Sequence, residues 1–182
     1  MPRIATPESI KASPAGSQPL LEAVNKQFGL VPNLFRVVGN SPAALEGYLG
    51  LNAALGKGAI DAKTRERIAL AVAEINGCDY CLSAHSYMGA NLAKLDEAEI
   101  LANRHGMSTD AKADAAVRFA ASVTTARGHV GDSDLAAIRA AGFSDAQIVE
   151  IVLHVALNTL TNYVNNVAET VIDFPVAKPL AA

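Results

Sequence analysis

The chain has 182 residues, of which 51% are apolar, 18% charged and 5% aromatic. This balance excludes an intrinsically disordered chain, and the sequence has no run of about twenty apolar residues that would span a membrane. Fifteen basic and eighteen acidic residues give a net charge of −3, with Lys and Arg scattered along the chain, so we expect neither nucleic acid nor a membrane as a partner.

The N-terminal segment differs from the rest of the chain. Residues 1–18 include Pro2, Pro7 and Pro14 and show neither helical nor strand periodicity. We therefore expect an extended N-terminal arm over residues 1–18 and a single helical domain over residues 19–182, which is long enough to bury a core. The arm has a single Arg and no apolar stretch, unlike a secretory signal, which predicts a cytoplasmic protein.

Helical segments separated by glycine and proline follow the arm. Before the cysteines, we expect helices over residues 19–28, 32–38, 42–55 and 61–75. Ser41 and Asp61 are suited to cap the third and the fourth, and Gly29 to end the first. The fourth segment is apolar around most of its circumference, as expected of a helix that other elements cover on several sides.

The helical pattern continues to the end of the domain. We expect helices over residues 78–93, 95–103, 110–127, 133–140 and 144–171, the last opened by a capping box of Ser144 and Gln147. The sequence has no hairpin turn and no sustained alternation of apolar and polar residues. It therefore predicts an all-α fold of about eight helices.

A polar stripe runs along the last predicted helix, at steps of three or four residues: His154, Asn158, Asn162, Asn165 and Glu169. We expect this stripe to face solvent or another subunit. The alternative is that His154 or Asn158 reaches the cysteines. Apolar residues on the other sides of the helix leave it with more than one face to cover, which favours self-association.

Reactive side chains are concentrated in residues 66–85, which hold two thiols, one imidazole and two glutamates in a largely apolar stretch. Cys78 and Cys81 lie three residues apart at the start of a predicted helix. Side chains with this spacing approach to about 5 to 6 Å, which is compatible with a reversible disulfide. His85 follows Cys81 by one helical turn, so the imidazole is within reach of the thiol.

A thiol with its ordinary pKa near 8.5 needs activation to form the reactive thiolate at neutral pH. The helix N-terminus supplies positive potential, and His85 is placed to accept the proton directly or through a water. A carboxylate would then hold the imidazole in the required tautomer. Glu66 and Glu74 both lie on the preceding helix, and their spacing does not choose between them.

The stretch from Thr64 to Gly89 resembles the core motif of the alkylhydroperoxidase AhpD and carboxymuconolactone decarboxylase superfamily, in its cysteine-bearing branch. That motif is a glutamate, twelve residues later a C-x-x-C, and four residues after it a histidine. The residues that match at every spacing are Glu66, Cys78, Cys81 and His85. One position departs from the best-known AhpD, because Tyr80 precedes the second cysteine where that protein has a histidine.

The resemblance implies an AhpD-like helical bundle that assembles into trimer-based homo-oligomers. It also implies that Glu66, rather than Glu74, orients His85, with Cys81 as the activated thiol and Cys78 as the resolving thiol. The expected activity is reduction of hydroperoxides, with an external dithiol or a redox protein as electron donor. This chemistry needs no bound cofactor and no metal.

Other functions remain open on the same residues. Decarboxylation or lactone chemistry of the carboxymuconolactone type would use His85 and Glu66 as acid and base, although that branch typically lacks the C-x-x-C. A third hypothesis is a redox switch without catalysis, in which Cys78 and Cys81 sense oxidation.

Metal and haem sites are further alternatives. Zinc would take Cys78, Cys81 and His85 together with a fourth ligand chosen from His105, His129 and His154, but no second ligand pair completes a closed site. Covalent haem is excluded because Leu82, and not a histidine, follows Cys81.

Overall fold

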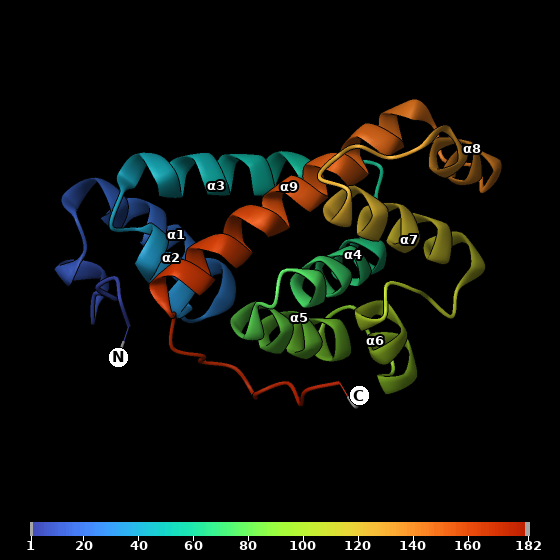
Figure 1. The fold of residues 1–182 in the computed structure, drawn as a ribbon. Coiled ribbons are helices and arrows are strands. Elements are labelled where there is room, and N and C mark those ends of the chain that lie inside the picture. The colour runs from blue at the N-terminus through green and yellow to red at the C-terminus, as the bar shows by residue number, and fades with distance from the viewer. Residues whose placement is uncertain (1, 181–182) are drawn as a thin grey trace.

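The computed structural model describes residues 2–180, and every regular element in this range is a helix (Figure 1). Two short 3-10 turns, Ile10–Ala12 and Ala15–Ser17, precede the α-helices. In chain order these are α1 (Gln18–Phe28), α2 (Asn33–Val38), α3 (Pro42–Leu55), α4 (Ala62–Ile75), α5 (Asp79–Asn91), α6 (Glu97–Arg104), α7 (Ala111–Thr125), α8 (Asp132–Ala140) and α9 (Asp145–Ala168). The predicted all-α fold is confirmed.

The residues predicted to cap the first turn of a helix, or to end a helix, do so in the structure. Ser41 and Asp61 accept hydrogen bonds from backbone N–H groups of the first turn of α3 and α4, at 3.3 and 3.0 Å. Ser144 and Gln147 form the capping box of α9. Gly29 ends α1 with a φ of 76°, a left-handed conformation that favours glycine.

The last helix is shorter than predicted, because it ends at Ala168 and not at Val171. Glu169 has a φ of 49°, and the N–H of Thr170 donates to the carbonyl of Asn165 at 3.1 Å. This arrangement satisfies a carbonyl of the final turn and ends the helix, as in a Schellman motif.

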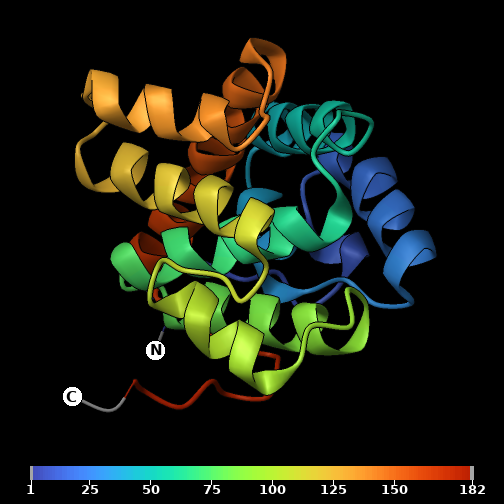
Figure 2. The same ribbon diagram turned by 90° about the vertical axis from the view of Figure 1, so that its right-hand side faces the viewer.

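α4 is the central helix and packs against α5, α6, α7 and α9 (Figure 2). Every residue from Ile68 to Ala73 is buried, which confirms the prediction that several elements cover this helix. α5 folds back beside α4 after the turn at Asn76 and Gly77. The hydrophobic contacts of α4 with its neighbours fix the position of α5 and of the cysteines at its start.

Buried apolar side chains form two clusters. One joins α1, α2, the start of α3, the end of α4 and α5, and it includes both cysteines. The other joins α4, α7, α8 and the first half of α9. The thiols are therefore part of a hydrophobic core and not of an exposed loop.

Four of the five residues of the polar stripe face inward, and for them the prediction of a solvent or subunit face is wrong. Glu169, just beyond the end of α9, is exposed. His154, Asn158, Asn162 and Asn165 are all buried. The outward side of α9 is apolar instead, with large exposed side chains at Val149, Leu153, Leu160, Tyr163 and Val167.

No single helix in residues 2–180 is long and apolar enough to cross a membrane. Taken together, α8 and α9 are long and apolar enough by length and composition, but the pair is bent by 117°.

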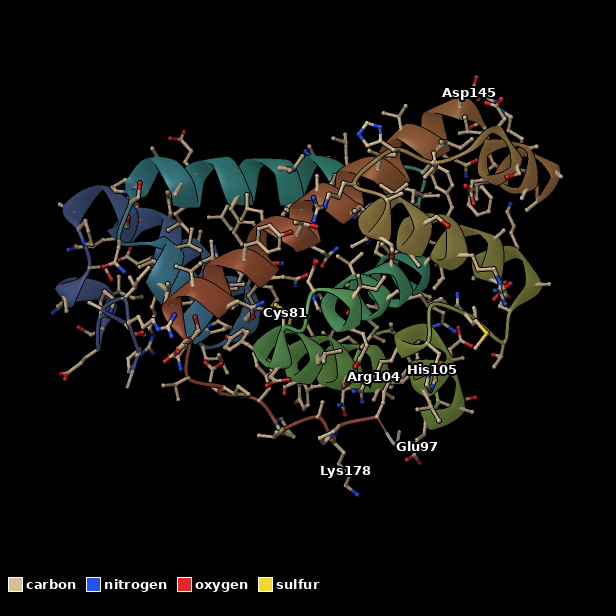
Figure 3. All side chains as sticks on the ribbon, viewed as in Figure 1. Cys81, Glu97, Arg104, His105, Asp145 and Lys178 are labelled. Carbon is tan, nitrogen blue, oxygen red and sulfur yellow. The ribbon has the colours of Figure 1, made fainter. Side chains whose placement is uncertain are left out.

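The chain beyond α9 runs along α5 and α6, as Figure 1 shows below these helices. The N–H of Ala177 donates to Oγ of Ser83 at 3.1 Å. Arg104 donates to the carbonyl of Lys178 at 2.8 Å (Figure 3). This C-terminal segment, residues 169–180, thereby ties the end of the chain to the helix that carries the cysteines.

Candidate functional site

The cysteines lie where α4 turns into α5. Gly77 has a φ of 60°, the left-handed conformation that this reversal requires. Cys78 is the N-cap of α5, and its Sγ accepts a hydrogen bond from the N–H of Cys81 at 3.3 Å. Cys78 is fully buried, and Cys81 is 3% exposed. Figure 3 shows Cys81 at the start of α5, beside α9.

Both cysteines are free thiols, and their surroundings drive their pKa values in opposite directions. Hydrogen bonding with the Cys78 thiol lowers the pKa of Cys81 to about 6 against the effect of burial, with help from the charge of His85 and from the amides of Asn165 and Asn162. The same contact with Cys81, together with burial, raises the pKa of Cys78. The surroundings therefore favour the thiolate at Cys81 and the protonated thiol at Cys78.

His85 is bound by Glu66 and not by Glu74. Nδ1 of His85 lies 2.8 Å from Oε2 of Glu66. Burial disfavours the charged imidazolium, but the charge and the hydrogen bond of Glu66 outweigh it and raise the pKa of His85. Since Glu66 occupies Nδ1, the other ring nitrogen is left for proton exchange. Glu74 pairs with Arg104 of α6 at 2.6 Å instead. The structure thus brings the four predicted site residues together.

Two side chains of the polar stripe of α9 complete the surroundings of Cys81, although the sequence pattern predicted a solvent or subunit face for them. Nδ2 of Asn165 donates to Sγ of Cys81 at 3.3 Å. Asn162 lies one turn earlier, and its Oδ1 accepts from Nδ2 of Asn76, at the turn before Cys78, at 2.9 Å. The only signal in the sequence was the regular spacing of the polar stripe, which does not tell whether a stripe faces inward.

The first half of the stripe does not reach the thiols. Asn158 donates to the carbonyl of His154 within α9, at 2.8 Å. Burial, assisted by the nearby positive charge of Arg65, lowers the pKa of His154 to about 4. His154 is therefore a neutral core residue at physiological pH.

Tyr80, which stands where AhpD has a histidine, faces away from the imidazole. Its hydroxyl accepts from the N–H of Leu34 at 3.1 Å and donates to Oδ1 of Asp173 at 2.8 Å. Its ring packs edge-on against Phe174 at 5.8 Å between centroids. Tyr80 thus anchors α5 to α2 and to the C-terminal segment, and it leaves the pairing of Glu66 with His85 undisturbed.

A pocket of about 350 Å³ opens between the start of α5 and the end of α9. Gly77, Asp79 and Tyr80 line it on one side, and Asn165 and Thr170 on the other. Asn165 both lines the pocket and contacts the sulfur of Cys81. Asn165 is therefore the residue that the pocket and the sulfur of Cys81 share.

The histidines considered as zinc ligands do not gather at the cysteines. Within residues 2–180, no three His, Cys, Asp or Glu side chains are arranged to hold a metal ion. His105 lies on the far side of α5 from Cys81, at the end of α6 (Figure 3). His129 follows α7, and His154 lies in the first half of α9.

Comparison with known proteins shows what the stretch around the cysteines resembles. Residues 42–122 match the carboxymuconolactone decarboxylase family. A stretch of 64 residues is 44% identical to an uncharacterized protein of Haemophilus influenzae, covering 35% of this chain and 51% of that protein. The match thus spans about half the length of that curated relative.

Solved structures share the fold. An AhpD-core, uncharacterized peroxidase-related protein from Ralstonia eutropha JMP134 superposes with a TM-score of 0.83 at 24% identity, over 94% of this chain and 92% of that chain. The debrominase Bmp8 gives a TM-score of 0.78 at 20% identity, over the same shares of 94% and 92%. The predicted resemblance is therefore confirmed: residues 42–122 match the carboxymuconolactone decarboxylase family, and the chain has the fold of AhpD-like, peroxidase-related proteins.

Proposed function

We propose that the protein is a thiol-dependent peroxidase that reduces hydroperoxides through Cys78 and Cys81. The observation that carries the proposal is the geometry of two adjacent sulfurs at the start of α5: Sγ of Cys78 accepts from the N–H of Cys81, and Sγ of Cys81 accepts from Asn165. These contacts lower the pKa of Cys81 and raise that of Cys78. A nucleophilic thiolate beside a protonated thiol is the arrangement that a two-cysteine peroxidase needs. The AhpD-like fold and the pairing of His85 with Glu66 support the proposal.

In the first step, the Cys81 thiolate attacks the terminal oxygen of a hydroperoxide. An S–O bond forms as the O–O bond breaks, so the sulfur loses two electrons and becomes a sulfenic acid while the peroxide is reduced. The leaving alkoxide takes a proton from the imidazolium of His85 and departs as an alcohol. Glu66 stabilises that imidazolium before the transfer.

In the second step, the thiol of Cys78 attacks the sulfenic acid of Cys81. The S–S bond forms as the S–O bond breaks, and the hydroxide leaves with the proton of Cys78 as water. An external dithiol, either a small molecule or a redox protein, reduces the disulfide by two successive exchanges and restores both thiols. Decarboxylation of the carboxymuconolactone type would use His85 and Glu66 alone and would need neither sulfur.

Peroxide consumption measured with tert-butyl hydroperoxide and excess dithiothreitol tests the proposal. The wild-type protein should turn over many equivalents, and Cys81→Ser should turn over none. Cys78→Ser should consume about one equivalent rapidly and then continue only as fast as dithiothreitol reduces the sulfenic acid. A wild-type protein that consumes no peroxide, or a Cys81→Ser variant as fast as wild type, contradicts the proposal.

A further inference from the structure

Two side-chain amides of α9 point from the core toward the sulfur of Cys81. Asn162 is 0% exposed and Asn165 is 3% exposed, so neither amide depends on solvent for its hydrogen bonds. Nδ2 of Asn165 donates to Sγ of Cys81 at 3.3 Å. Sulfur is a weak, diffuse acceptor, so this donor is only partly satisfied in the reduced protein.

The orientation of Asn162 is fixed from its oxygen side. Its Oδ1 accepts from Nδ2 of Asn76 at 2.9 Å, and the carbonyl of Asn76 accepts from Asn166 at 3.0 Å. These two bonds tie the end of α9 to the turn that carries Cys78. They leave Nδ2 of Asn162 on the side of Cys81, where it contributes to the lowered pKa of that thiol.

Nδ2 of Asn162 has no hydrogen-bond acceptor within normal distance in the described part of the chain. A buried donor without an acceptor destabilises a folded protein, and such groups are rare unless they serve a purpose. The Oδ1 of Asn165 is likewise buried without a donor in residues 2–180. Both unused groups lie beside the one sulfur expected to gain an oxygen atom.

We propose, building on the function proposed above, that Asn162 and Asn165 form an amide cradle for oxygen at Cys81, in which Asn165 holds the thiolate sulfur and Nδ2 of Asn162 donates to the oxygen transferred from the peroxide. During attack, negative charge spreads onto the peroxide oxygens, and a fixed neutral donor stabilises that charge without competing for the proton of the alcohol. After attack, the same N–H donates to the oxygen of the sulfenic acid. Asn165 also lines the pocket between α5 and α9, so one residue of the cradle borders that pocket.

Reaction with two electrophiles distinguishes a donor to the transferred oxygen from a residue that only stabilises the Cys81 thiolate. In a Cys78→Ser background, the rate constants of Cys81 with tert-butyl hydroperoxide and with iodoacetamide are measured across pH, because iodoacetamide consumes the same thiolate but transfers no oxygen. Asn162→Leu keeps the branching of the side chain and removes the donor. Asn162→Asp also removes the donor but keeps the acceptor for Asn76. Asn158→Leu is the matched control, one turn earlier on the same buried face.

The ratio of the peroxide to the iodoacetamide rate constant should fall about 10- to 100-fold in both Asn162 variants and stay unchanged in Asn158→Leu. Asn165→Leu should move the midpoint of iodoacetamide alkylation to higher pH. A folded Asn162 variant with the wild-type ratio overturns the cradle while leaving the peroxidase intact. If tert-butyl hydroperoxide does not oxidise Cys81 in the parent protein, the proposed function and the cradle both fail.

A second measurement needs no substitution in α9. In ¹⁵N-labelled Cys78→Ser protein, one equivalent of tert-butyl hydroperoxide should shift the side-chain amide resonances of Asn162 and leave those of Asn158 in place. Unmoved Asn162 resonances in a protein whose sulfenic acid is confirmed by dimedone labelling would overturn the cradle.

Discussion

Cys78 and Cys81 lie three residues apart on one helical turn, yet the pKa values of their thiols differ because their neighbours differ. Cys81 receives hydrogen bonds and lies near the positive charge of His85, whereas Cys78 is fully buried and shares its proton with Cys81. Oxidation of the pair should therefore begin at Cys81. The fraction of Cys81 that is thiolate then determines how fast the protein reacts with an electrophile.

The rate of alkylation of Cys81 by iodoacetamide should rise with pH around a midpoint near 6, the pKa of its thiol. His85→Ala removes a positive neighbour of the thiolate, and we expect the midpoint to move up by about one pH unit. Glu66→Gln should shift it in the same direction, because the imidazolium loses its carboxylate partner. The measurement is the alkylation rate from pH 4 to 10, followed by mass spectrometry.

Glu74→Gln is the control for this experiment. Glu74 lies on the same helix as Glu66 but pairs with Arg104, away from His85. Its replacement should leave the midpoint where it is. An equal shift in Glu66→Gln and Glu74→Gln would mean that the carboxylates act through overall charge and not through His85.

The residues of the site were predictable to different degrees. The spacing of Cys78, Cys81 and His85 along one helix fixes their proximity, so sequence sufficed for them. Glu66 and Glu74 differ by about 80° around α4, and only the resemblance to a family, and then the packing of α5 and α6, distinguished them. The stripe that holds Asn162 and Asn165 is expected to face solvent or another subunit, and this expectation fails because Cys81 and Asn76 supply partners for the two amides inside the molecule.

Among the helices, α5 is held from outside by the C-terminal segment. Tyr80 provides the central connection, with its hydroxyl bonded to Leu34 and to Asp173. Tyr80→Phe removes the hydroxyl, so Leu34 and Asp173 both lose a hydrogen bond. The free energy of unfolding should fall by about 1 to 2 kcal/mol. Urea denaturation measures this loss, and the alkylation midpoint of Cys81 should change little.

Tyr87→Phe is the matched comparison, because the ring of Tyr87 also contacts Phe174, at 6.0 Å, but is half exposed. We expect a change of less than about 0.5 kcal/mol there. If the two variants lose the same stability, the ring contacts and not the hydroxyl of Tyr80 hold the segment.

The junction of α6 with α7 depends on a buried carboxylate. Glu99, which is 3% exposed, accepts from Arg67 of α4 at 2.6 Å and from Ser108 and Thr109 of the connecting loop. Burial alone would raise the pKa of Glu99, but hydrogen bonds from Ser108, Thr109 and Asn103 lower it to about 2. The carboxylate thus joins three elements.

Because the folded pKa of Glu99 lies below its unfolded value of about 4.3, its contribution to stability is complete above that value and is lost as the pH falls toward 2. We expect Glu99→Gln to reduce the free energy of unfolding by roughly 3 kcal/mol at neutral pH, with the difference shrinking between pH 4.5 and 2. Denaturation curves across this range measure it. Glu97→Gln, an exposed change on the same helix, should be neutral, and a pH-independent loss in Glu99→Gln would contradict the mechanism.

For the whole molecule, the exposed side of α9 predicts self-association. Its apolar residues recur alternately at four and three residues, the spacing of a helix-pairing seam: Val149, Leu153, Ala156, Leu160, Tyr163 and Val167. α3 lies beside α9 (Figure 1), and its Gly47 and Gly50 have open space in front of them. We expect a second copy of this chain to pack against this face, since small residues permit close approach of helices.

Light scattering coupled to gel filtration measures the mass in solution. We expect an oligomer, with a multiple of three chains as the family resemblance implies. Leu160→Glu should reduce the mass toward that of the single chain, 18.9 kDa. Leu92→Glu introduces the same charge at a residue that is 68% exposed on another face, and it should leave the mass unchanged. A wild-type protein that runs as a monomer at micromolar concentration contradicts this prediction.

The overall architecture was the part most accessible from the sequence. Capping residues and glycines marked the helix boundaries, and the all-round apolar pattern of α4 identified the central helix. What escaped was the orientation of α9, because a helix with one polar and one apolar side can present either side to the core. In the structure, the polar stripe finds partners inside at Cys81 and Asn76, and Ile148, Ile151 and Val155 are buried in the core as well.

The central claim is that the two sulfurs cycle between dithiol and disulfide, and a thiol titration after one equivalent of tert-butyl hydroperoxide tests it most directly. The account predicts that the native protein loses both thiols, that mass spectrometry finds one intramolecular disulfide between Cys78 and Cys81, and that dithiothreitol restores both. A folded protein whose two thiols remain titratable after peroxide would contradict it.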